Sequence, residues 1–554
     1  MNKKVCSFPI LFALLALLIG TCAVVFPASA QAAPTSTGSI TVSGTVASSY
    51  DAYQIFSANV VDGDSDAKIA TDLAWVSDAV RDAALPVLHS AGMPNSQTTA
   101  QEAAEWLNTD SHLTSALSAQ LARSLQSSGA ESVALNAGTA AELSCGYWLI
   151  VAKDDAIAQG EAGTAPIMAL VGGSAVTVKP KAATPKVAKH VLEDSTAAWQ
   201  KAADATVADD LYWRLSATVP AGLTAYDTYT VRFVDTMSAG LDPSKVAASM
   251  RVYVAAGADG GFDAVSAGKD GRAGTEPAKG WTDITAQCGV SVDGKTFTVR
   301  TGDLIAALGG VDAFTAGARV VAVYNAPLNS ACNHGIAKGN PNEVYLRYPR
   351  SPFADQSGDA GFTCTPSDDA CAYTWDLALT KRGNDGDKPL AGAVLSIADD
   401  RGRTLAADGT WDAEGKATVT TGEDGRVTVS GVDSGKLEVR ELKAPKGYTA
   451  FEGTRSVTVK AEGLDVDQVA AAKPKLTITA ESPLRADSAD GSTGSLEASL
   501  INTPTGTPPS ITTGGFMPST GDMAMYAAAA AAVAGAALIV VALLIKRGGG
   551  SHKE

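Results

Sequence analysis

Short runs of alternating apolar and polar residues, separated by turn residues, constrain this chain more than any other feature. Between Pro185 and Tyr348 the runs are YWRLSATV, YTVRFVD, SMRVYVAA, KTFTVRTG, ARVVAVYNA and EVYLRY. Between Tyr373 and Thr503 they are WDLALTK, AVLSIAD, RVTVSGV, LEVREL, RSVTVK, KLTITAE and SLEASLI. A period of two, with β-branched residues and Gly, Asp or Asn turns, is typical of strands. Both segments therefore predict an all-β chain of tandem β-sandwiches.

The segment from Gly38 to Val178 combines strands with a helical pattern. It opens with SITVSGTV and returns to strands at YWLIVA and IMALVG. Between them lies an Ala-rich stretch whose apolar residues recur at helical spacing, namely Ala103, Trp106, Leu107, Leu113 and Leu117. We therefore expect a first sandwich that carries helical insertions.

The N-terminus has the three parts of a secretory signal peptide. Lys3 and Lys4 precede an apolar run, 10–26, and small residues follow at Ala28, Ala30 and Ala32. The apolar run is too short for a typical membrane span and is followed by an A-x-A cleavage site. We therefore predict that residues 1–32 are removed and that the mature chain is exported.

The other end of the chain predicts a membrane anchor. Residues 523–545 carry no charge and would span about 34 Å as a helix, which is enough for a hydrocarbon core. Lys546 and Arg547 follow at once, and positive residues there favour the cytoplasmic side. The Pro, Thr and Gly-rich residues before this helix cannot bury a core and predict an exposed linker.

Five cysteines remain after removal of the signal peptide, in an oxidising compartment. The short polar loop TCTPSDDAC favours a disulfide between Cys364 and Cys371. A disulfide between Cys288 and Cys332 would close a longer loop and stabilise the fold by roughly 4 kcal/mol. Cys145 is then left over and is expected in the core.

The charge and the remaining motifs exclude several classes of function. The formal net charge of −16 disfavours a nucleic-acid partner, because phosphates would be repelled. Asp62, Asp64 and Asp66 alternate as calcium ligands can, but the loop glycine and the closing glutamate are missing, so we expect a solvated turn and no metal. No zinc-protease, hydrolase or phosphate-binding motif occurs. We expect no cofactor and no turnover of a free substrate.

The linker before the predicted membrane helix contains Met517-Pro518-Ser519-Thr520-Gly521. Together with the apolar span and the basic tail, it resembles the cell-wall sorting signal L-P-x-T-G, with Met in place of Leu. The resemblance implies that a sortase cleaves between Thr520 and Gly521 and passes the acyl group to an amine. The signal requires an extended peptide, which Pro518 favours, and close approach of the enzyme, which Gly521 permits.

A second resemblance concerns the amine that accepts this acyl group. The segment 176–185, Val-Thr-Val-Lys-Pro-Lys-Ala-Ala-Thr-Pro, resembles the pilin motif of shaft subunits of sortase-assembled pili, which commonly ends Y-P-K. Lys181 matches the acceptor lysine, and Lys179 stands in place of the tyrosine. The alternative is that both are solvated linker lysines, the commonest fate of lysine.

A third resemblance covers the last sandwich, which is similar to the collagen-adhesin B-type domain of many pilins. It rests on four stretches of sequence: LTK at 379–381, PLAGA at 389–393, ELKAPKGY at 441–448 and INT at 501–503. The resemblance implies an internal isopeptide bond, with Lys381 as nucleophile, Asn502 as the attacked amide and Glu441 as the acid. Burial favours the neutral lysine and the protonated carboxyl that this chemistry needs.

The middle sandwich resembles the middle domain of shaft pilins through PKVAKHV at 185–191 and FVDTMSAGL at 233–241. The resemblance implies Lys189 as nucleophile and Asp235 as acid. The family usually ends its last strand Y-S-N-N-P and takes the asparagine from it, but this chain has YPRSP at 348–352. Either Asn340 or Asn342 substitutes, or the bond is lost and an ion pair between Lys189 and Asp235 remains. We expect the loss.

The resemblances together predict a structural shaft pilin with immunoglobulin-like, collagen-adhesin type sandwiches. It would be anchored to the Gram-positive cell wall in a fimbrium after a transient membrane tether. Its implied partners are pilin-class and housekeeping sortases, further copies and minor pilins, peptidoglycan, and a host glycoprotein or matrix ligand. The alternative is a monomeric wall-anchored adhesin. The predicted segments are signal peptide 1–32, N-terminal domain 33–178, pilin-motif linker 179–185, middle domain 186–363, B-type domain 364–503, sorting-signal linker 504–522, membrane helix 523–545 and tail 546–554.

Overall fold

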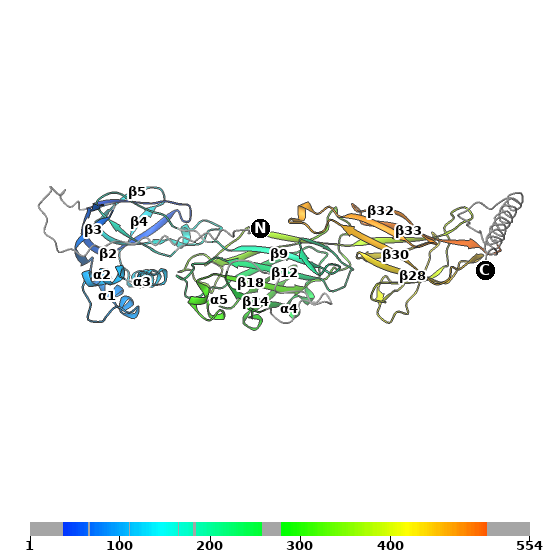
Figure 1. Cartoon of the computed structure of the whole chain (residues 1–554), viewed down its shortest axis with the longest axis horizontal. Coiled ribbons are helices and arrows are strands. Elements are labelled where there is room, and N and C mark those ends of the chain that lie inside the picture. The colour runs from blue at the N-terminus through cyan, green and yellow to red at the C-terminus, as the bar shows by residue number, and fades with distance from the viewer. Residues whose placement is uncertain are drawn as a thin grey trace, which may run out of the picture.

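The structure is a computed structural model that describes residues 37–64, 67–109, 111–163, 165–180, 184–257 and 279–506. Three modules follow one another along the long axis of the molecule (Figure 1). We call them the first module (37–180), the middle module (184–373) and the third module (374–506). Strands dominate all three, so the predicted all-β class is confirmed.

The first module is a small sandwich with helices on one face. One sheet has the order β5-β1-β8 and the other β3-β2-β6-β7, with β4 also paired to β2. Apolar residues of both sheets share one core, and a second core lies between the larger sheet and the helices. The strands are β1 (Thr37–Val42), β2 (Ser49–Asp62), β3 (Lys68–Trp75), β4 (Val133–Asn136), β5 (Ala140–Ser144), β6 (Gly146–Ala152), β7 (Ile167–Val171) and β8 (Val176–Val178).

The helices of the first module are α1 (Asp78–Ser90), α2 (Ala100–Asn108) and α3 (Ser115–Ser128). Thr99 caps α2 in a capping box with Glu102, and the Thr114 hydroxyl accepts from the backbone N–H of Leu117 at the start of α3. Gly129 ends α3 in the left-handed conformation, which glycine adopts without strain. The predicted helical insertions are therefore present.

The middle module is a larger sandwich. Its sheets have the orders β10-β9-β12-β18-β14-β15 and β11-β21-β19-β13-β17-β16, with β20 paired to β19, and their inner faces share one core. The elements are β9 (Lys186–Glu193), β10 (Ala198–Gln200), β11 (Ala202–Asp204), β12 (Tyr212–Val219), β13 (Arg232–Met237), α4 (Val246–Ser249), β14 (Arg251–Ala256), β15 (Thr282–Asp283), β16 (Gly289–Asp293), β17 (Thr296–Arg300), α5 (Leu304–Ala307), α6 (Val311–Phe314), β18 (Ala318–Asn325), β19 (Asn340–Pro349), β20 (Phe362–Cys364) and β21 (Asp368–Tyr373).

The third module is a sandwich whose first and last strands are neighbours. One sheet has the order β27-β22-β33-β29, with β32 on β33, and the other β25-β24-β23-β28-β30-β31, with β26 on β23. β22 and β33 run parallel. The strands are β22 (Trp375–Gly383), β23 (Val394–Ala398), β24 (Thr404–Leu405), β25 (Trp411–Asp412), β26 (Val419–Thr420), β27 (Arg426–Val432), β28 (Gly435–Lys443), β29 (Tyr448–Thr449), β30 (Thr454–Glu462), β31 (Lys475–Ala480), β32 (Leu484–Asp490) and β33 (Ser495–Pro504).

The boundary between the middle and third modules differs from the predicted one at residues 363 and 364. β20 and β21 both pair with β19, and β21 also pairs with β11, so this chain segment completes the middle sheet. The third module begins at β22. The sequence analysis predicted no strand at 368–373, and the pairing of β21 with β19 and β11 places it in the middle module.

The two predicted disulfides are not formed, because Cys288, Cys332, Cys364 and Cys371 are all thiols. Cys364 lies opposite Arg347 of β19 and Cys371 opposite Pro341 of the same strand. Six residues along a strand separate the two cysteines by about 20 Å. A disulfide requires Cα atoms within about 7 Å, so a short loop in sequence did not mean a short distance.

The pair Cys288 and Cys332 fails for a similar reason. Cys288 precedes β16, whose Gly289 lies opposite Arg300, and Arg300 lies opposite Arg232 at the start of β13. Cys332 lies beside Gly240, just beyond the other end of β13. The two thiols therefore lie near opposite ends of that strand.

Several predictions fall outside the described residues. They are the signal peptide, Asp66, Lys181, the sorting signal with Met517, Pro518, Thr520 and Gly521, and the anchor helix. Within the described ranges, no helix combines the length and apolar character that a membrane crossing requires.

Candidate intramolecular cross-link sites

The third module brings Lys381, Glu441 and Asn502 together in its core. Lys381 lies on β22, Asn502 on the neighbouring strand β33, and Glu441 on β28 of the facing sheet. Lys381 Nζ is 3.8 Å from Glu441 Oε1. Asn502 Nδ2 donates to both carboxylate oxygens of Glu441, at 2.9 and 3.0 Å. The three residues predicted from sequence therefore converge.

The strand pattern explains why a lysine stands inside this sandwich. Burial alternates strictly along β22, from Trp375 to Gly383, so Lys381 occupies an inward position. The parallel ladder sets Gly383 opposite Asn502 and Lys381 opposite Leu500. The lysine Nζ donates to the carbonyl of Leu500 at 3.0 Å, which holds the amine beside the last strand.

The surroundings of Lys381 favour its uncharged form. Burial lowers the pKa of Lys381 to about 8, although the nearby Glu441 carboxylate raises it in part. The side chains of Lys381 and Glu441 are both 0% exposed. Asn502 Oδ1 is buried and has no hydrogen-bond partner among the described residues. The site therefore offers an amine that is readily deprotonated, a carboxyl group and an amide in mutual contact.

The middle module contains a second group of the same kind. Lys189 on β9 forms a buried ion pair with Asp235 on β13, and both side chains are 0% exposed. Tyr324 on β18 joins them: its hydroxyl is 3.0 Å from Lys189 Nζ and donates to Asp235 Oδ2 at 3.0 Å. Asn342 on β19 donates from Nδ2 to the same hydroxyl at 2.8 Å.

Burial controls the charges of this second group as well. It lowers the pKa of Lys189 to about 8, against the raising effect of Asp235. Burial also raises the pKa of Asp235, and the Lys189 charge opposes that shift. The rings of Trp213 and Tyr324 each lie 5.5 Å from the lysine nitrogen. These shifts favour a neutral amine beside a neutral acid.

The structure distinguishes Asn342 from Asn340, which the sequence left as alternatives. Both are 0% exposed. Asn340 donates to the carbonyls of Asn333 and Ala372 and accepts from the backbone N–H of Asn333. Asn342 Oδ1 has no hydrogen-bond partner among the described residues. The expected Lys189–Asp235 ion pair is present, but a suitable asparagine lies beside it too.

Two residues of the second group were missed or left open by the sequence. Tyr324 was not singled out, although it lies in the strand-like run ARVVAVYNA. The alternation of β19 places Asn342, Val344 and Leu346 on the inner face of the sheet. That alternation was a usable signal for an inward asparagine, whereas no pattern in the sequence connects Tyr324 with Lys189.

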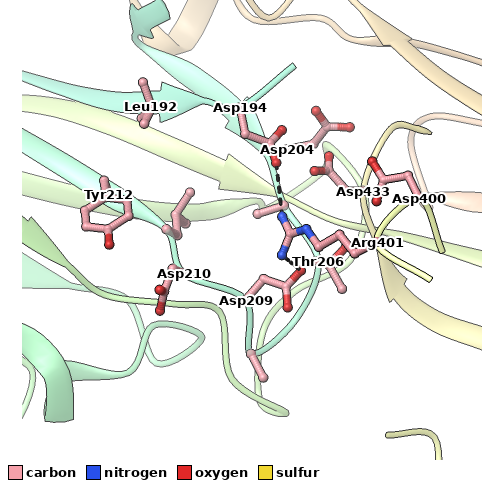
Figure 2. Close-up of a pocket in the computed structure, with 13 residues that line it drawn as sticks. Leu192, Asp194, Asp204, Thr206, Asp209, Asp210, Tyr212, Asp400, Arg401 and Asp433 are labelled. Carbon is pink, nitrogen blue, oxygen red and sulfur yellow. Dashed lines mark hydrogen bonds and ion pairs between the residues drawn. The ribbon is translucent and has the colours of Figure 1, made fainter. Parts of the chain in front are cut away.

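A cavity of about 720 Å³ lies between the middle and third modules and is lined by residues of both. Figure 2 shows Arg401 of the third module reaching Asp194 and Asp209 of the middle module, with Asp204, Asp400 and Asp433 around it. Arg403 binds Asp209 through both terminal nitrogens. The cavity contains no lysine–acid–asparagine group, and its arginine contacts tie the two modules together.

The loop 158–163 of the first module packs against the middle module. Tyr348 donates to the Gly160 carbonyl at 2.8 Å, and the Gly163 N–H donates to the Arg350 carbonyl at 2.7 Å. Arg123 of α3 donates to the Pro352 carbonyl at 3.0 Å. Residues 348–352, where the sequence departs from the Y-S-N-N-P pattern, therefore serve as a docking segment in this chain.

Comparison with known families matches residues 376–473 to the SpaA prealbumin-like fold domain. This segment is similar to the SpaA prealbumin-like fold domain. The matched segment includes Lys381 and Glu441 and ends before Asn502. Asn502 lies on β33, which pairs with β22. The trio therefore joins the first strand of the SpaA domain to a strand that follows the matched segment.

Among curated proteins, the trypsin-resistant surface T6 protein of Streptococcus pyogenes serotype M6 is 29% identical over 143 residues. That match spans 24% of this chain and 24% of the relative. The chain is therefore similar to about a quarter of the length of this Streptococcus pyogenes surface protein.

Solved structures give further similarities. The T6 backbone pilin of serotype M6 Streptococcus pyogenes is 16% identical, with 85% of this chain and 98% of that chain covered at a TM-score of 0.45. The full-length major pilin SpaD of Corynebacterium diphtheriae is 15% identical, with 84% and 98% covered at a TM-score of 0.40.

Proposed function

We propose that this chain is the shaft subunit of a cell-surface pilus, a structural protein and not an enzyme. The observation that carries the proposal is the pair of buried lysine–acid–asparagine groups. Each group places a lysine of the first strand of a sandwich near an asparagine of a strand at or near its end. Ordinary globular domains do not bury lysine and asparagine in this way without a reason, because desolvating them is costly. An internal amide bond supplies that reason.

In the third module the proposed bond joins Lys381 Nζ to Cγ of Asn502. A proton first passes from the lysine ammonium to Glu441, which leaves a neutral amine and a neutral acid. The Asn502 amide, turned by 180°, then accepts a hydrogen bond from the Glu441 hydroxyl. The amine attacks Cγ, the bond from Cγ to Nδ2 breaks, and Nδ2 leaves as ammonia with a proton from Nζ. Chain mass falls by about 17 Da, the mass of the ammonia.

In the middle module the proposed bond joins Lys189 to Asn342, with Asp235 as the acid. This replaces the loss that the sequence favoured. The support is the geometry around the Tyr324 hydroxyl, which contacts both the lysine nitrogen and the Asn342 amide. Asn340 already uses its side chain in three hydrogen bonds.

The two bonds would let a thin fibre carry tension without unfolding. A pull along the chain would bypass residues 190–341 and 382–501, because the amides shorten the path between the ends of each sandwich. Three modules in a row, as in Figure 1, suit such a load. The covalent path would pass through Lys181, Lys189, Asn342, Lys381, Asn502 and Thr520.

Polymerisation would be the work of a pilin-class sortase. It would cleave between Thr520 and Gly521 within the motif that starts Met517-Pro518, and join Thr520 to Lys181 of the next copy. A housekeeping sortase would attach the fibre to peptidoglycan. Lys181 lies outside the described residues; in the sequence it falls between β8, which ends at Val178, and β9, which begins at Lys186.

The test is the pattern of surface extracts on a denaturing gel. The wild-type chain should form a ladder of covalent polymers, and Lys181→Ala should reduce it to the monomer. Lys179→Ala is the matched control, because Lys179 is an exposed lysine two residues away. A ladder that persists in Lys181→Ala contradicts this acceptor. A wild-type chain found only as a wall-linked monomer would instead identify a single anchored adhesin.

A further inference from the structure

The acids of the two cross-link groups contact their asparagines differently. Glu441 receives hydrogen bonds directly from Asn502 Nδ2. Asp235 is one methylene shorter, and among the described residues its carboxylate accepts hydrogen bonds only from Lys189 and Tyr324. The Tyr324 hydroxyl occupies the gap, 3.0 Å from Asp235 Oδ2 and 2.8 Å from Asn342 Nδ2.

We propose that Tyr324 is a proton relay through which Asp235 polarises the Asn342 amide during bond formation in the middle module. The proposal rests on the Lys189–Asn342 bond of the proposed function and adds a fourth catalytic residue to it. The third module has no equivalent, since no hydroxyl among the described residues donates to or accepts from Lys381, Glu441 or the Asn502 side chain.

Proton positions follow from the chemistry. The starting state is the ion pair of Lys189 and Asp235, in which the Tyr324 hydroxyl donates to Asp235 and accepts from Asn342 Nδ2. A proton then passes from the Lys189 ammonium to Asp235, and the Asn342 amide turns so that Oδ1 replaces Nδ2. Asp235 now donates to the Tyr324 oxygen, and the Tyr324 hydroxyl donates to Oδ1. The turn replaces the hydrogen bond from Asn342 Nδ2 to Tyr324 with one from Tyr324 to Asn342 Oδ1. Asn342 Oδ1 has no hydrogen-bond partner among the described residues, so it is free to accept that bond.

The bond-forming step then balances. Neutral Lys189 Nζ attacks Cγ of Asn342, Oδ1 takes the proton of Tyr324, and Tyr324 takes the proton of Asp235. When the intermediate collapses, the protons return by the same route and the bond from Cγ to Nδ2 breaks. Nδ2 leaves as ammonia with one proton from Nζ. Tyr324 ends in its starting state. Asp235 ends in the protonated form in which it entered this step, with the proton that it took from the Lys189 ammonium.

The surroundings of Tyr324 suit this role. The side chain is 0% exposed, and the Phe297 ring packs edge-on against it at 4.7 Å, which fixes the direction of the hydroxyl. Burial and the neighbouring Asp235 carboxylate raise the phenol pKa well above its usual value. The group therefore stays protonated and can pass a proton on without storing a charge.

The test uses the full chain and counts linked peptides by mass spectrometry after digestion. Tyr324→Phe should slow the linking of Lys189 with Asn342 by about 100-fold, the lower end of what general acid catalysis contributes to a rate, so samples are taken at fixed times after synthesis. The Lys381–Asn502 link in the same sample should stay complete. Tyr229→Phe is the matched control, because Tyr229 is also 0% exposed in this core and its hydroxyl has no hydrogen-bond partner among the described residues.

The outcomes separate the relay from the bond it serves. Full linkage in Tyr324→Phe overturns the relay and leaves the bond intact. A wild-type chain without the Lys189–Asn342 link overturns the middle-module bond itself. A second variant tests the relay even if Tyr324→Phe misfolds. Glu441→Asp places the shorter acid in the third module, which lacks the hydroxyl. It should lose the Lys381–Asn502 link, and full linkage there would show that aspartate needs no relay.

Discussion

The middle and third modules place a buried lysine, an acid and an asparagine together with different side chains. Each buries a lysine on its first strand and an asparagine on a strand near its end, and burial lowers the lysine pKa to about 8 in both. The third module uses a glutamate that reaches the amide directly, whereas the middle module uses an aspartate and a tyrosine hydroxyl. The comparison teaches that the acid and the amide must be connected by hydrogen bonds. Where the acid is too short to reach the amide, a hydroxyl from a third strand can connect them.

The largest expected effect comes from removing one asparagine of the comparison. Asn502→Ala should abolish the Lys381 bond. After correction for the substitution itself, the chain should then be about 17 Da heavier than the cross-linked chain, because no ammonia is lost. The module should also lose about 5 kcal/mol of stability, because the bond no longer closes a loop of roughly 120 residues. Intact-mass analysis and thermal unfolding measure both. The exposed Asn384 is the control, and a similar loss in Asn384→Ala would contradict the assignment.

The next prediction asks which asparagine serves the middle module. Asn342→Ala should remove the Lys189 bond and destabilise the module by about 5 kcal/mol. Asn340→Ala should keep the bond and cost only about 1–3 kcal/mol, because it breaks buried hydrogen bonds. Peptide mass spectrometry separates them. A link that persists in Asn342→Ala and disappears in Asn340→Ala would reverse the assignment.

A pH profile sharpens the comparison between bonded and unbonded lysine. In Asn502→Ala, Lys381 stays a free amine whose folded pKa, about 8, lies below its unfolded value of 10.5. The unfolded chain then binds more protons between these values, so stability should rise as the pH increases from about 8 to about 10.5. Denaturant unfolding at several pH values measures this.

The wild-type chain provides the control for that profile. An amide nitrogen does not titrate, so the lysine should add no slope between pH 8 and 10.5. The same rise in the wild-type chain and in Asn502→Ala would mean that Lys381 is a free amine in both.

The smallest effect concerns the junction between the two modules. Arg403→Ala removes a paired contact with Asp209 and should cost about 1–3 kcal/mol without changing either internal bond. Arg401 is half exposed, so Arg401→Ala should cost less than about 1 kcal/mol. Calorimetry measures the two losses. An altered mass deficit in either variant would show that the cross-link groups depend on the junction.

Local sequence motifs were sufficient to predict the site residues of the third module. LTK, ELKAPKGY and INT gave Lys381, Glu441 and Asn502, and the structure brings these residues together. The middle module was harder, because the familiar asparagine position is occupied by Tyr348-Pro349-Arg350, which docks the first module instead. Asn342 was visible only as one of two alternatives.

What the sequence could not supply was the pairing of distant strands. Tyr324 meets Lys189 because β18 and β9 both pair with β12, and no local pattern encodes that neighbourhood. The predicted disulfides were wrong for the same reason, because the number of residues between two cysteines does not determine their distance in a folded sheet. The boundary at residue 363 was misplaced because β21 finds its partners, β19 and β11, far along the chain.

The most direct test of this account is peptide mass spectrometry of the purified wild-type chain, with a search for two branched peptides. We expect Lys381 joined to Asn502 and Lys189 joined to Asn342, each with the loss of ammonia, about 17 Da per bond. Unmodified peptides that contain these lysines and asparagines, recovered in full yield, would contradict the account in both modules.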